Sequence, residues 1–330
     1  MKKALFIRLD RMGDLVLTMP CDELVSSTHE VHWLVPKGLD FVAEAATPKK
    51  SFQSMSKEGS FKNILQLRNM IKEIKPEVSV SFHVPWWVNF TLWFCRVKKR
   101  GGVLSQWHSY LFLNKGLRQK RSRCEYHEME YNYLLVEHCF DLKMNREKWQ
   151  PLKLSEPNVE IPVDTNEKYY VVHPGMGGSA LNWSTDHYVE LINNLSEKST
   201  VIITGTKNDE QYLAPLKQQL NGNPKVVWLD KQLKGPQLLK LLKHSLATIA
   251  PSTGVLHLGA SLGVASLGIY SPIQVHHANR WGPKGANVSA FTPNVKCPVQ
   301  FECLQKECPH YYCMDKLTVK TVAEKALSNQ

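Results

Sequence analysis

The sequence lacks an apolar run of the roughly 18 residues that a membrane-spanning helix requires. The apolar stretch that begins at Ala4 stops at Arg8, short of the roughly 7–15 apolar residues at the centre of a signal peptide. No nucleic-acid-binding module is recognisable, and no single predicted helix or strand concentrates Lys and Arg. We therefore expect a cytoplasmic protein with no nucleic-acid partner and no obligate protein partner.

The composition is that of an ordinary globular protein, with 43% hydrophobic and 22% charged residues. A length of 330 residues suits two domains of about 150 residues each. The net charge of +11 favours an anionic partner, such as a phosphorylated small molecule or an acidic membrane surface, although a basic balance can also serve solubility alone.

Two successive α/β patterns divide the chain. A strand at 4–9, a glycine turn at 12–14 and a helical pattern from Leu15 open the first, and a strand at 169–172 followed by a glycine-rich loop opens the second. The proline-punctuated stretch at 150–168 separates them. We predict an α/β protein made of two Rossmann-like domains that face a cleft, residues 1–164 and 165–330, the second ending in a cysteine cluster and a helix.

Asp14 is the candidate catalytic residue of the first half. Ligands of open α/β sheets bind beyond the carboxyl ends of the strands, where the loop after the first strand places Asp10, Arg11, Gly13 and Asp14. An aspartate near a helix N-terminus stays ionised and can act as a general base. The alternative is that Asp14 only caps a helix that starts at Leu15, because Asp is a favoured N-cap.

Two loops of the second half are candidate anion sites. Gly177, Gly178 and Ser179 could present backbone N–H groups to a phosphate, and Ser252, Thr253 and Gly254 stand at a second strand-to-helix junction. Two such loops in one domain suggest a diphosphate, although both could be tight turns. His257, one helical turn further on, is expected in a supporting role.

Four cysteines cluster near the C-terminus: Cys297, Cys303, Cys308 and Cys313. Four thiols suit zinc in number, but their spacing is wide for a zinc ribbon or knuckle. Buried thiols or redox-labile bridges are the preferred interpretation, so no metal is expected.

A basic segment, 98–123, carries Arg118 and Arg121 among the aromatic residues Trp107, Tyr110 and Phe112. We expect its aromatics to rest on a membrane while its cations meet anionic groups there. The alternative is a solvated basic face.

The chain resembles glycosyltransferase family 9, the lipopolysaccharide heptosyltransferases. The likeness runs in order through nearly the whole sequence and includes the terminal cysteine cluster. Its motifs are residues 7–20, 127–132 (HEMEYN), 173–175 (HPG), 182–184 (NWS), 252–258 (STGVLHL), 270–272 (YSP) and 280–283 (RWGP).

The resemblance implies a GT-B fold with an N-terminal acceptor domain and a C-terminal nucleotide-sugar domain. It implies an inverting, metal-independent enzyme in which Asp14 is the catalytic base. By position, Thr253, Gly254 and His257 match donor contacts, Asp209 matches an acidic residue that binds the nucleotide ribose, and the loop through Ser179 matches a second phosphate-facing loop.

Two positions depart from the family pattern. Leu181 stands where a lysine often faces the diphosphate, and Ser252 replaces the usual aspartate before Thr-Gly. The two losses compensate in charge, or they indicate a different donor or lost activity. Lys207 or Lys231 could supply the missing cation.

The sequence therefore predicts a cytoplasmic enzyme at the inner membrane surface that transfers a sugar, heptose from ADP-heptose, to a lipopolysaccharide core. The nucleotide-sugar is a co-substrate, and no cofactor is expected. Besides Arg8 and Arg11, the predicted acceptor contacts are Arg118 and Arg121. The alternatives are a nucleotide-sugar epimerase of the same fold and a non-catalytic, basic nucleic-acid-binding protein.

Overall fold

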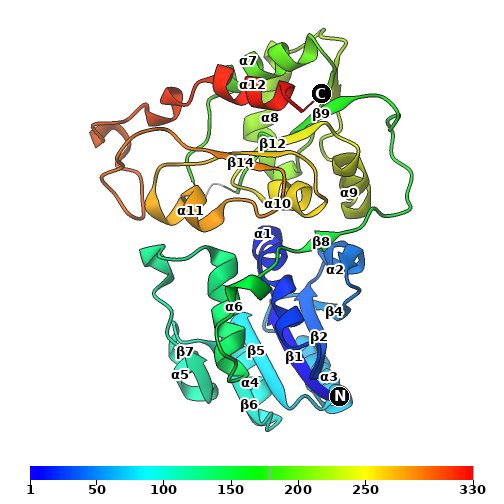
Figure 1. Ribbon diagram of the computed structural model, residues 1–330, viewed down its shortest axis with the longest axis vertical. Coiled ribbons are helices and arrows are strands. Elements are labelled where there is room, and N and C mark those ends of the chain that lie inside the picture. The colour runs from blue at the N-terminus through cyan, green and yellow to red at the C-terminus, as the bar shows by residue number, and fades with distance from the viewer. Residues whose placement is uncertain (178–179, 330) are drawn as a thin grey trace. The chain divides into compact units, whose positions relative to one another are not determined.

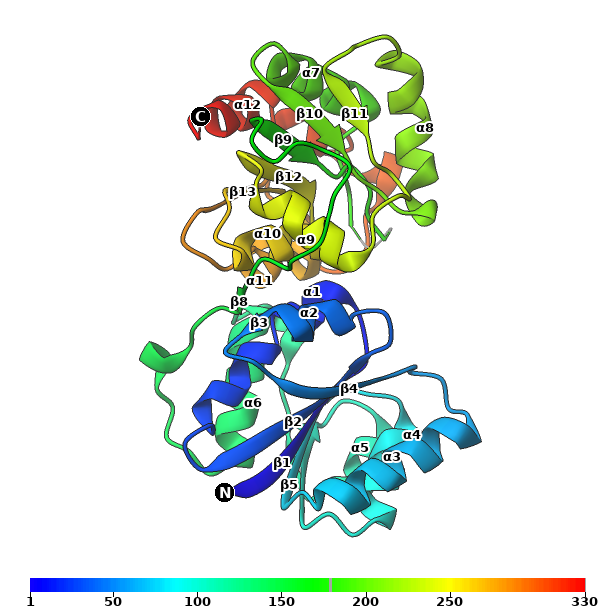
Figure 2. The same ribbon diagram turned by 90° about the vertical axis from the view of Figure 1, so that its right-hand side faces the viewer.

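The computed structural model describes residues 1–177 and 180–329, which form two compact units. The first comprises Met1–Arg121 and Glu128–Leu154, and the second comprises Ser122–His127 and Ser155–Gln330. The main division thus falls after Leu154, whereas the sequence analysis placed the domain boundary between residues 164 and 165. Figures 1 and 2 show each unit as a sheet with helices on both of its faces. No helix among the described residues is long and apolar enough to cross a membrane.

The first unit contains a six-stranded sheet in the order β4-β2-β1-β5-β6-β7, and every neighbouring pair is parallel. Its strands are β1 (Lys2–Arg8), β2 (His29–Pro36), β4 (Ser51–Met55), β5 (Val78–His83), β6 (Lys99–Val103) and β7 (Lys115–Leu117). Its helices are α1 (Met12–Val16), α2 (Asp40–Ala45), α3 (Phe61–Ile74), α4 (Trp86–Phe94), α5 (Trp107–Phe112) and α6 (Glu128–Cys139). A two-stranded antiparallel ribbon joins β3 (Ala46–Thr47) to β8 (Lys153–Leu154).

The second unit repeats this topology, with the parallel order β11-β10-β9-β12-β13-β14. Its strands are β9 (Tyr169–Val172), β10 (Thr200–Ile203), β11 (Val226–Trp228), β12 (Ala247–Pro251), β13 (Ser266–Ile269) and β14 (Val288–Phe291). Its helices are α7 (Thr185–Ser196), α8 (Glu210–Gln219), α9 (Gly235–Lys243), α10 (Gly254–Ser261), α11 (Ala278–Trp281) and α12 (Val319–Leu327). Numbered within each unit, both sheets have the order 3-2-1-4-5-6 of the Rossmann fold, which confirms the predicted fold class.

Local sequence explains why these elements form. The four residues Ala4–Ile7 of β1 are fully buried, as expected for a central strand covered on both faces. Helix α3 buries Leu67, Met70, Ile71 and Ile74 on one face. Ser60 caps its N-terminus by accepting a hydrogen bond from the Asn63 N–H at 3.2 Å.

The first unit is a three-layer sandwich. Helices α3, α4 and α5 cover one face of the sheet, and α6 covers the other (Figure 2). Phe6 of β1 packs edge-on against Trp33 and Phe82, with ring centroids 5.2 and 5.7 Å apart. This core fixes the central strands and therefore the loop that follows β1.

One predicted helix differs in detail. The apolar pattern after Leu15 suggested a single helix, but α1 ends at Val16 and a separate 3₁₀ helix spans Met19–Leu24. Pro20 near the start of that second helix lacks the N–H that a continuous α-helix would need there.

Candidate functional site

Several of the predicted site residues lie at the topological switch points of the two sheets. In an open parallel sheet, the connections on either side of the switch point leave in opposite directions and open a crevice at the carboxyl ends of those strands. In the first unit these strands are β1, which Asp14 follows, and β5, which ends at His83. In the second they are β9 and β12, followed by the loop from His173 and by Thr253.

A buried arginine organises the site of the first unit. Arg8, the last residue of β1, is 2% exposed. Its Nε donates to Asp10 Oδ1 at 2.6 Å, and its Nη2 donates to Asp14 Oδ1. Burial, the largest influence, lowers the pKa of Arg8, but Asp10, Asp14 and Glu128 outweigh it and leave that pKa raised. The guanidinium is therefore a permanent cation enclosed by carboxylates.

The Asp14 carboxyl group has a pKa raised from 3.8 to about 6. Burial is the main cause, because it penalises the charged form, and Asp10 and Glu128 add to it. Arg8 and Arg11 act in the opposite direction. At neutral pH the group is mostly ionised, yet it accepts a proton far more readily than an ordinary aspartate.

Asp14 lies inside α1, at its third residue, and the N-cap position belongs to Arg11. The alternative in which Asp14 caps a helix beginning at Leu15 is therefore wrong, because the helix starts at Met12. The Asp14 carbonyl accepts a hydrogen bond from Thr18 Oγ1 at 2.6 Å, and Asn132 of α6 donates to that same hydroxyl at 3.0 Å. Helix α6 thus supports the turn that presents Asp14.

The four arginines predicted to bind the acceptor have different surroundings. Arg11 and Arg118 are exposed. Arg121 donates to the buried carboxylate of Glu128 and lies over the Tyr131 ring, 5.5 Å from its centroid. Arg8 is engaged by Asp10 and Asp14, but its buried Nη1 has no hydrogen-bond partner in the described chain.

In the second unit, Asp209 lies in the connection after β10 and comes close to the loop after β9. Its Oδ2 accepts hydrogen bonds from the backbone N–H and the Oγ1 of Thr206, both at 2.7 Å, and lies 4.0 Å from His173 Nε2. A Cβ added to Gly175 would lie 2.2 Å from the Asp209 carboxyl carbon. Gly175 is therefore required for the close approach of these two loops.

The N-terminus of α10 has unused hydrogen-bonding groups. Thr253 is its N-cap, but the side chain makes no capping bond, and its buried Oγ1 has no partner among the described residues. The same holds for Nδ1 of His257, which is 4% exposed. Burial lowers the pKa of His257 to about 4, so the ring is neutral. A free hydroxyl, uncapped backbone N–H groups and a neutral imidazole suit an anionic ligand.

The remaining donor candidates are placed as follows. Ser252 hydrogen-bonds the Tyr270 hydroxyl, and Gly177 is exposed. Gly178 and Ser179 lie outside the described residues. Leu181 is half-buried against the core of the second unit, and Lys231 pairs with Glu210. Lys207 begins a 3₁₀ helix and is exposed.

The terminal cysteines do not assemble a metal site in the described part of the chain. All four thiols are free, and no group of three or more His, Cys, Asp or Glu side chains among residues 1–177 and 180–329 could hold a metal ion. Burial raises the pKa of the Cys313 thiol, and Cys303, Cys297 and Cys308 raise it further. The four thiols therefore lie close enough to act on one another, and whether they hold a metal or form bridges stays a prediction.

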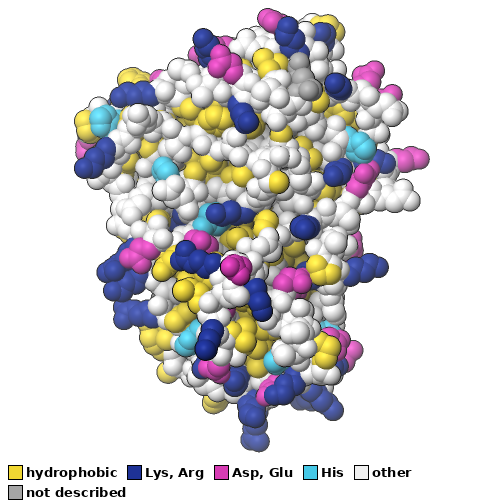
Figure 3. All heavy atoms as spheres, viewed as in Figure 1, with side chains coloured by type: hydrophobic (Ala, Val, Ile, Leu, Met, Phe, Trp, Pro, Cys, Tyr) yellow, Lys and Arg dark blue, Asp and Glu magenta, His cyan; other side chains and the backbone are white. Residues whose placement is uncertain are grey.

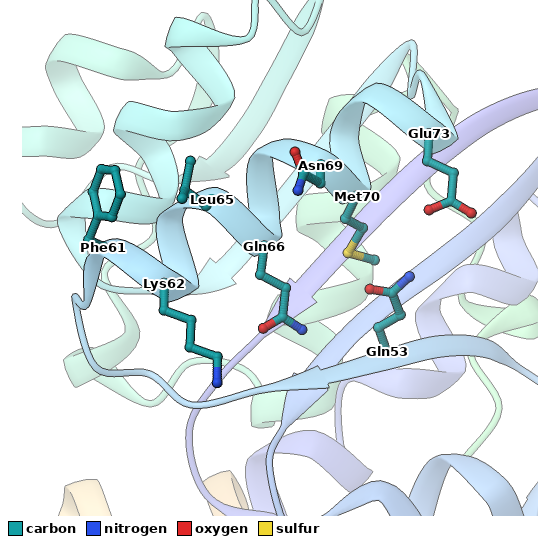
Figure 4. A pocket seen from close by; sticks show the side chains of 8 residues that line it. All are labelled: Gln53, Phe61, Lys62, Leu65, Gln66, Asn69, Met70 and Glu73. Carbon is teal, nitrogen blue, oxygen red and sulfur yellow. The ribbon is translucent and has the colours of Figure 1, made fainter.

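A separate open groove of about 580 Å³ lies between α3 and the edge strand β4. Side chains of α3, including Phe61, Lys62 and Glu73, line it together with Gln53 (Figure 4). None of the predicted site residues lines this groove.

Comparison with known proteins identifies the family. Residues 87–309 match the model of glycosyltransferase family 9 (heptosyltransferase). The chain belongs to this family. A Haemophilus influenzae protein provisionally named a glycosyltransferase is 29% identical over 305 residues, which cover 86% of each chain.

Solved structures of the family share the fold. A family 9 glycosyltransferase from Veillonella parvula superposes with a TM-score of 0.79 at 15% identity, over 99% of this chain and 97% of that one. The E. coli ADP-heptose lipopolysaccharide heptosyltransferase II gives 0.77 at 15% identity, over 100% and 98% of the two chains. E. coli heptosyltransferase WaaC, solved with ADP, gives 0.69 at 15% identity, over 99% and 100%.

The structure adds residues that the sequence did not single out. Asp10 and Glu128 act on Asp14, and Asn132 supports its turn. Loss of hydration lowers the pKa of His83, the residue after which β5 ends, while Asp10 raises it. The resemblance included residues 127–132 as a motif, which was the available signal for Glu128 and Asn132 but assigned them no role.

Proposed function

We propose that this family 9 enzyme is an inverting, metal-independent transferase that moves heptose from ADP-heptose to a hydroxyl of a lipopolysaccharide core. The observation that carries the proposal is the Asp14 carboxylate, with a pKa of about 6 and held by Arg8 at the carboxyl end of β1. A base of that pKa removes a hydroxyl proton more effectively near neutral pH than an ordinary aspartate.

Family 9 membership and the fold of the heptosyltransferases support the choice of reaction. WaaC was solved with ADP and with an ADP-2-deoxy-2-fluoro heptose, which makes ADP-heptose the first donor to test. The reaction is a direct displacement at the anomeric carbon. Asp14 takes the proton of the acceptor hydroxyl as its oxygen attacks, the new glycosidic bond forms, and ADP leaves with the bonding electron pair.

The second unit would stabilise the leaving diphosphate. The N-terminus of α10 offers backbone N–H groups, the Thr253 hydroxyl and the neutral His257 ring, whose Nδ1 has no partner in the described chain. Donors of this kind stabilise charge that develops in the transition state. We propose Gly177, Gly178, Ser179, Ser252 and Gly254 as further donor contacts, and Asp209 as the ribose contact.

For the acceptor we propose contacts from Arg11 and Arg118, whose side chains are exposed. Arg8 and Arg121 are committed to carboxylates, so we propose that they mainly position Asp14 and Glu128. The unpartnered Nη1 of Arg8 is the part of that side chain left for an acceptor oxygen. We further propose that the enzyme works in the cytoplasm, at the inner membrane.

Donor identity is tested by thermal shift against ADP-, UDP-, GDP- and dTDP-sugars. A ligand at 100 times its dissociation constant stabilises the folded state by about 2.7 kcal/mol. We expect ADP-heptose to give the largest shift, and transfer to require a lipopolysaccharide-core acceptor. Turnover of the nucleotide-sugar without any acceptor would instead favour an epimerase.

A further inference from the structure

Large aromatic side chains are exposed on three neighbouring helices of the first unit. They are Phe61 of α3, Trp86, Trp93 and Phe94 of α4, and Trp107 and Tyr110 of α5. Phe61, Phe94 and Trp107 are 75%, 61% and 64% exposed. Water-exposed aromatics in this number are unusual for a surface without a partner. We refer to these six residues as the aromatic ledge.

The ledge is continuous along α4. Phe90 contacts Trp86, Trp93 and Phe94, with ring centroids 6.2, 5.9 and 6.1 Å apart. Phe112 of α5 joins through Phe90 at 5.6 Å. These α4 positions recur at helical spacing on one face, while Trp87 is buried and donates to the Lys57 carbonyl. The helix therefore presents one aromatic stripe outward and another side to the core.

A cationic pocket adjoins this stripe. It has a volume of about 490 Å³, and Phe94 of the ledge forms part of its wall. Five basic residues line it and no acidic residue does: Arg68, Lys72, Lys75, Arg96 and Lys98. Within the described residues, none of the five has a carboxylate oxygen within 4.0 Å. Glu77, on which the Lys98 charge acts, is paired with Lys2.

The partial negative charge of helix C-termini does not by itself explain why five cations lie together here. The pocket lies where α3 and α4 end, and cations are common there because each helix C-terminus carries about half a negative charge. Two such ends offset about one of the five positive charges. A large positive excess remains.

The basic segment predicted from sequence supplies little of that excess. Lys99 and Lys115 both pair with Asp141, and Arg121 pairs with Glu128. Arg100 donates to the carbonyls of Phe112 and Val97. Figure 3 shows Lys and Arg side chains beside hydrophobic ones over α5 and β7, but the unpaired cations of the pocket come mainly from α3 and the end of α4.

We propose that this face docks on an anionic phospholipid bilayer, with the cationic pocket holding a lipid phosphate and the aromatic ledge lying among the headgroups. Tryptophan and tyrosine favour the membrane–water interface, where one end of the ring is apolar and the other is hydrated. Clustered Lys and Arg are attracted to acidic lipids. The positive charge of the pocket thus matches the lipid phosphates, and the apolar rings of the ledge match the membrane–water interface beside them.

The cationic pocket is separate from the Asp14 site. Pro76 and Val97 of the pocket precede β5 and β6, so the pocket lies at the amino ends of these strands. Asp14 follows the carboxyl end of β1, which pairs parallel to β5. The two sites are about one strand length apart, on the order of 20 Å. This inference rests on the first unit alone and does not depend on the proposed transferase activity.

The test is co-sedimentation of the full chain with phosphatidylcholine vesicles that contain 0% or about 30% phosphatidylglycerol, at low and high salt. The pocket variant is Lys72→Glu with Arg96→Glu. Its control, Lys198→Glu with Lys306→Glu, changes the net charge equally at exposed lysines of the second unit. The ledge variant is Trp93→Ser with Phe94→Ser, and its control is Phe301→Ser with Tyr312→Ser, which are also exposed.

We expect binding that requires the anionic lipid, falls at least about tenfold in the pocket variant and the ledge variant, and changes less than about twofold in either control. Brominated lipid should quench tryptophan fluorescence of the wild type, and less so of Trp93→Phe. Equal loss in the pocket variant and its control, or no vesicle binding by the wild type, would overturn the proposal. So would binding of single-stranded oligonucleotide in preference to vesicles. Failure of the transferase proposal is recognised separately, because donor thermal shifts need no vesicles.

Discussion

Arg8 and Asp14 form an ion pair in which the cation is almost completely buried and the anion reaches the edge of the site. Burial raises the pKa of Asp14, and Arg8 limits that rise, so the pKa of the carboxyl group is about 6. The pair therefore sets both the orientation and the basicity of the proposed base.

Asp14→Asn should leave donor binding intact and reduce turnover by at least about a hundredfold, because general-base assistance contributes about 10²–10⁴-fold. The amide has the shape of the carboxyl group but cannot take the proton. Single-turnover transfer and donor thermal shift measure the two effects separately. Glu44→Gln, at an exposed position of α2, is the matched control. Turnover close to wild type would remove Asp14 from this role.

The pH dependence of kcat/KM should follow the Asp14 pKa. The base must be ionised, so the rate should rise about tenfold per pH unit below pH 6 and level off above it, given the pKa of about 6. A profile that is flat from pH 5 to 8 would contradict the assignment.

Arg8→Gln should move this inflection to higher pH, because the cation lowers the Asp14 pKa and the variant removes it. Arg8→Lys keeps the positive charge, so the inflection should stay close to its wild-type pH. The lysine cannot donate from two nitrogens in a fixed fork, so turnover should fall. A purely structural role for Arg8 would change rate or stability but leave the inflection where it is. The full pH profile of each variant therefore distinguishes positioning from packing.

Gly175→Ala should weaken donor binding. The new methyl group would meet the Asp209 carboxyl group at 2.2 Å, so the loops after β9 and β10 must separate. Overpacking of this kind costs about 1–3 kcal/mol. Donor titration and thermal unfolding measure the effect, and Gly222→Asn, at a turn with open space and a positive φ that Asn tolerates, is the control. Equal behaviour of the two variants would show that the close contact is unimportant.

His257→Gln should change how acid affects stability. The native pKa of His257 is lowered from 6.5 to about 4 by burial, so the unfolded chain binds the proton more strongly. Stability from the neutral ring is complete above pH 6.5 and is lost as pH falls below it, by about 3 kcal/mol at pH 4. The variant should lose less over this range in urea titrations. Parallel pH curves for the two proteins would mean that His257 takes up its proton without unfolding.

Much of the fold is predictable because its signals are local. The buried run Ala4–Ile7, the spaced apolar residues of α3 and the run Tyr169–Val172 each predict their element directly. Helix α4 was not predicted, because its exposed side is aromatic rather than polar, so no alternation of polar and apolar residues marks its two faces. The polar edge strand β4 gave no alternation strong enough to recognise.

The candidate site is predictable only in part for a different reason. Asp14 can be recognised from the glycine turn that carries it. Glu128, which acts on it, belongs to a helix more than a hundred residues later in the sequence. No local pattern could show that Asp141 pairs with both Lys99 and Lys115, or that Arg8 would be enclosed. The basic segment therefore looked more available in sequence than it is in the fold.

The short segment Ser122–His127 has a practical consequence. It interrupts the first unit, yet its backbone carbonyls accept hydrogen bonds from Gln274 and Gln300, and the His127 ring bonds the Gly282 carbonyl at 2.8 Å. The polypeptide thus changes unit three times, and no single cut separates two complete halves. In a chimera that takes the N-terminal half from a relative, residues 122–127 will not match the second unit. They should therefore come from the protein that supplies the second unit.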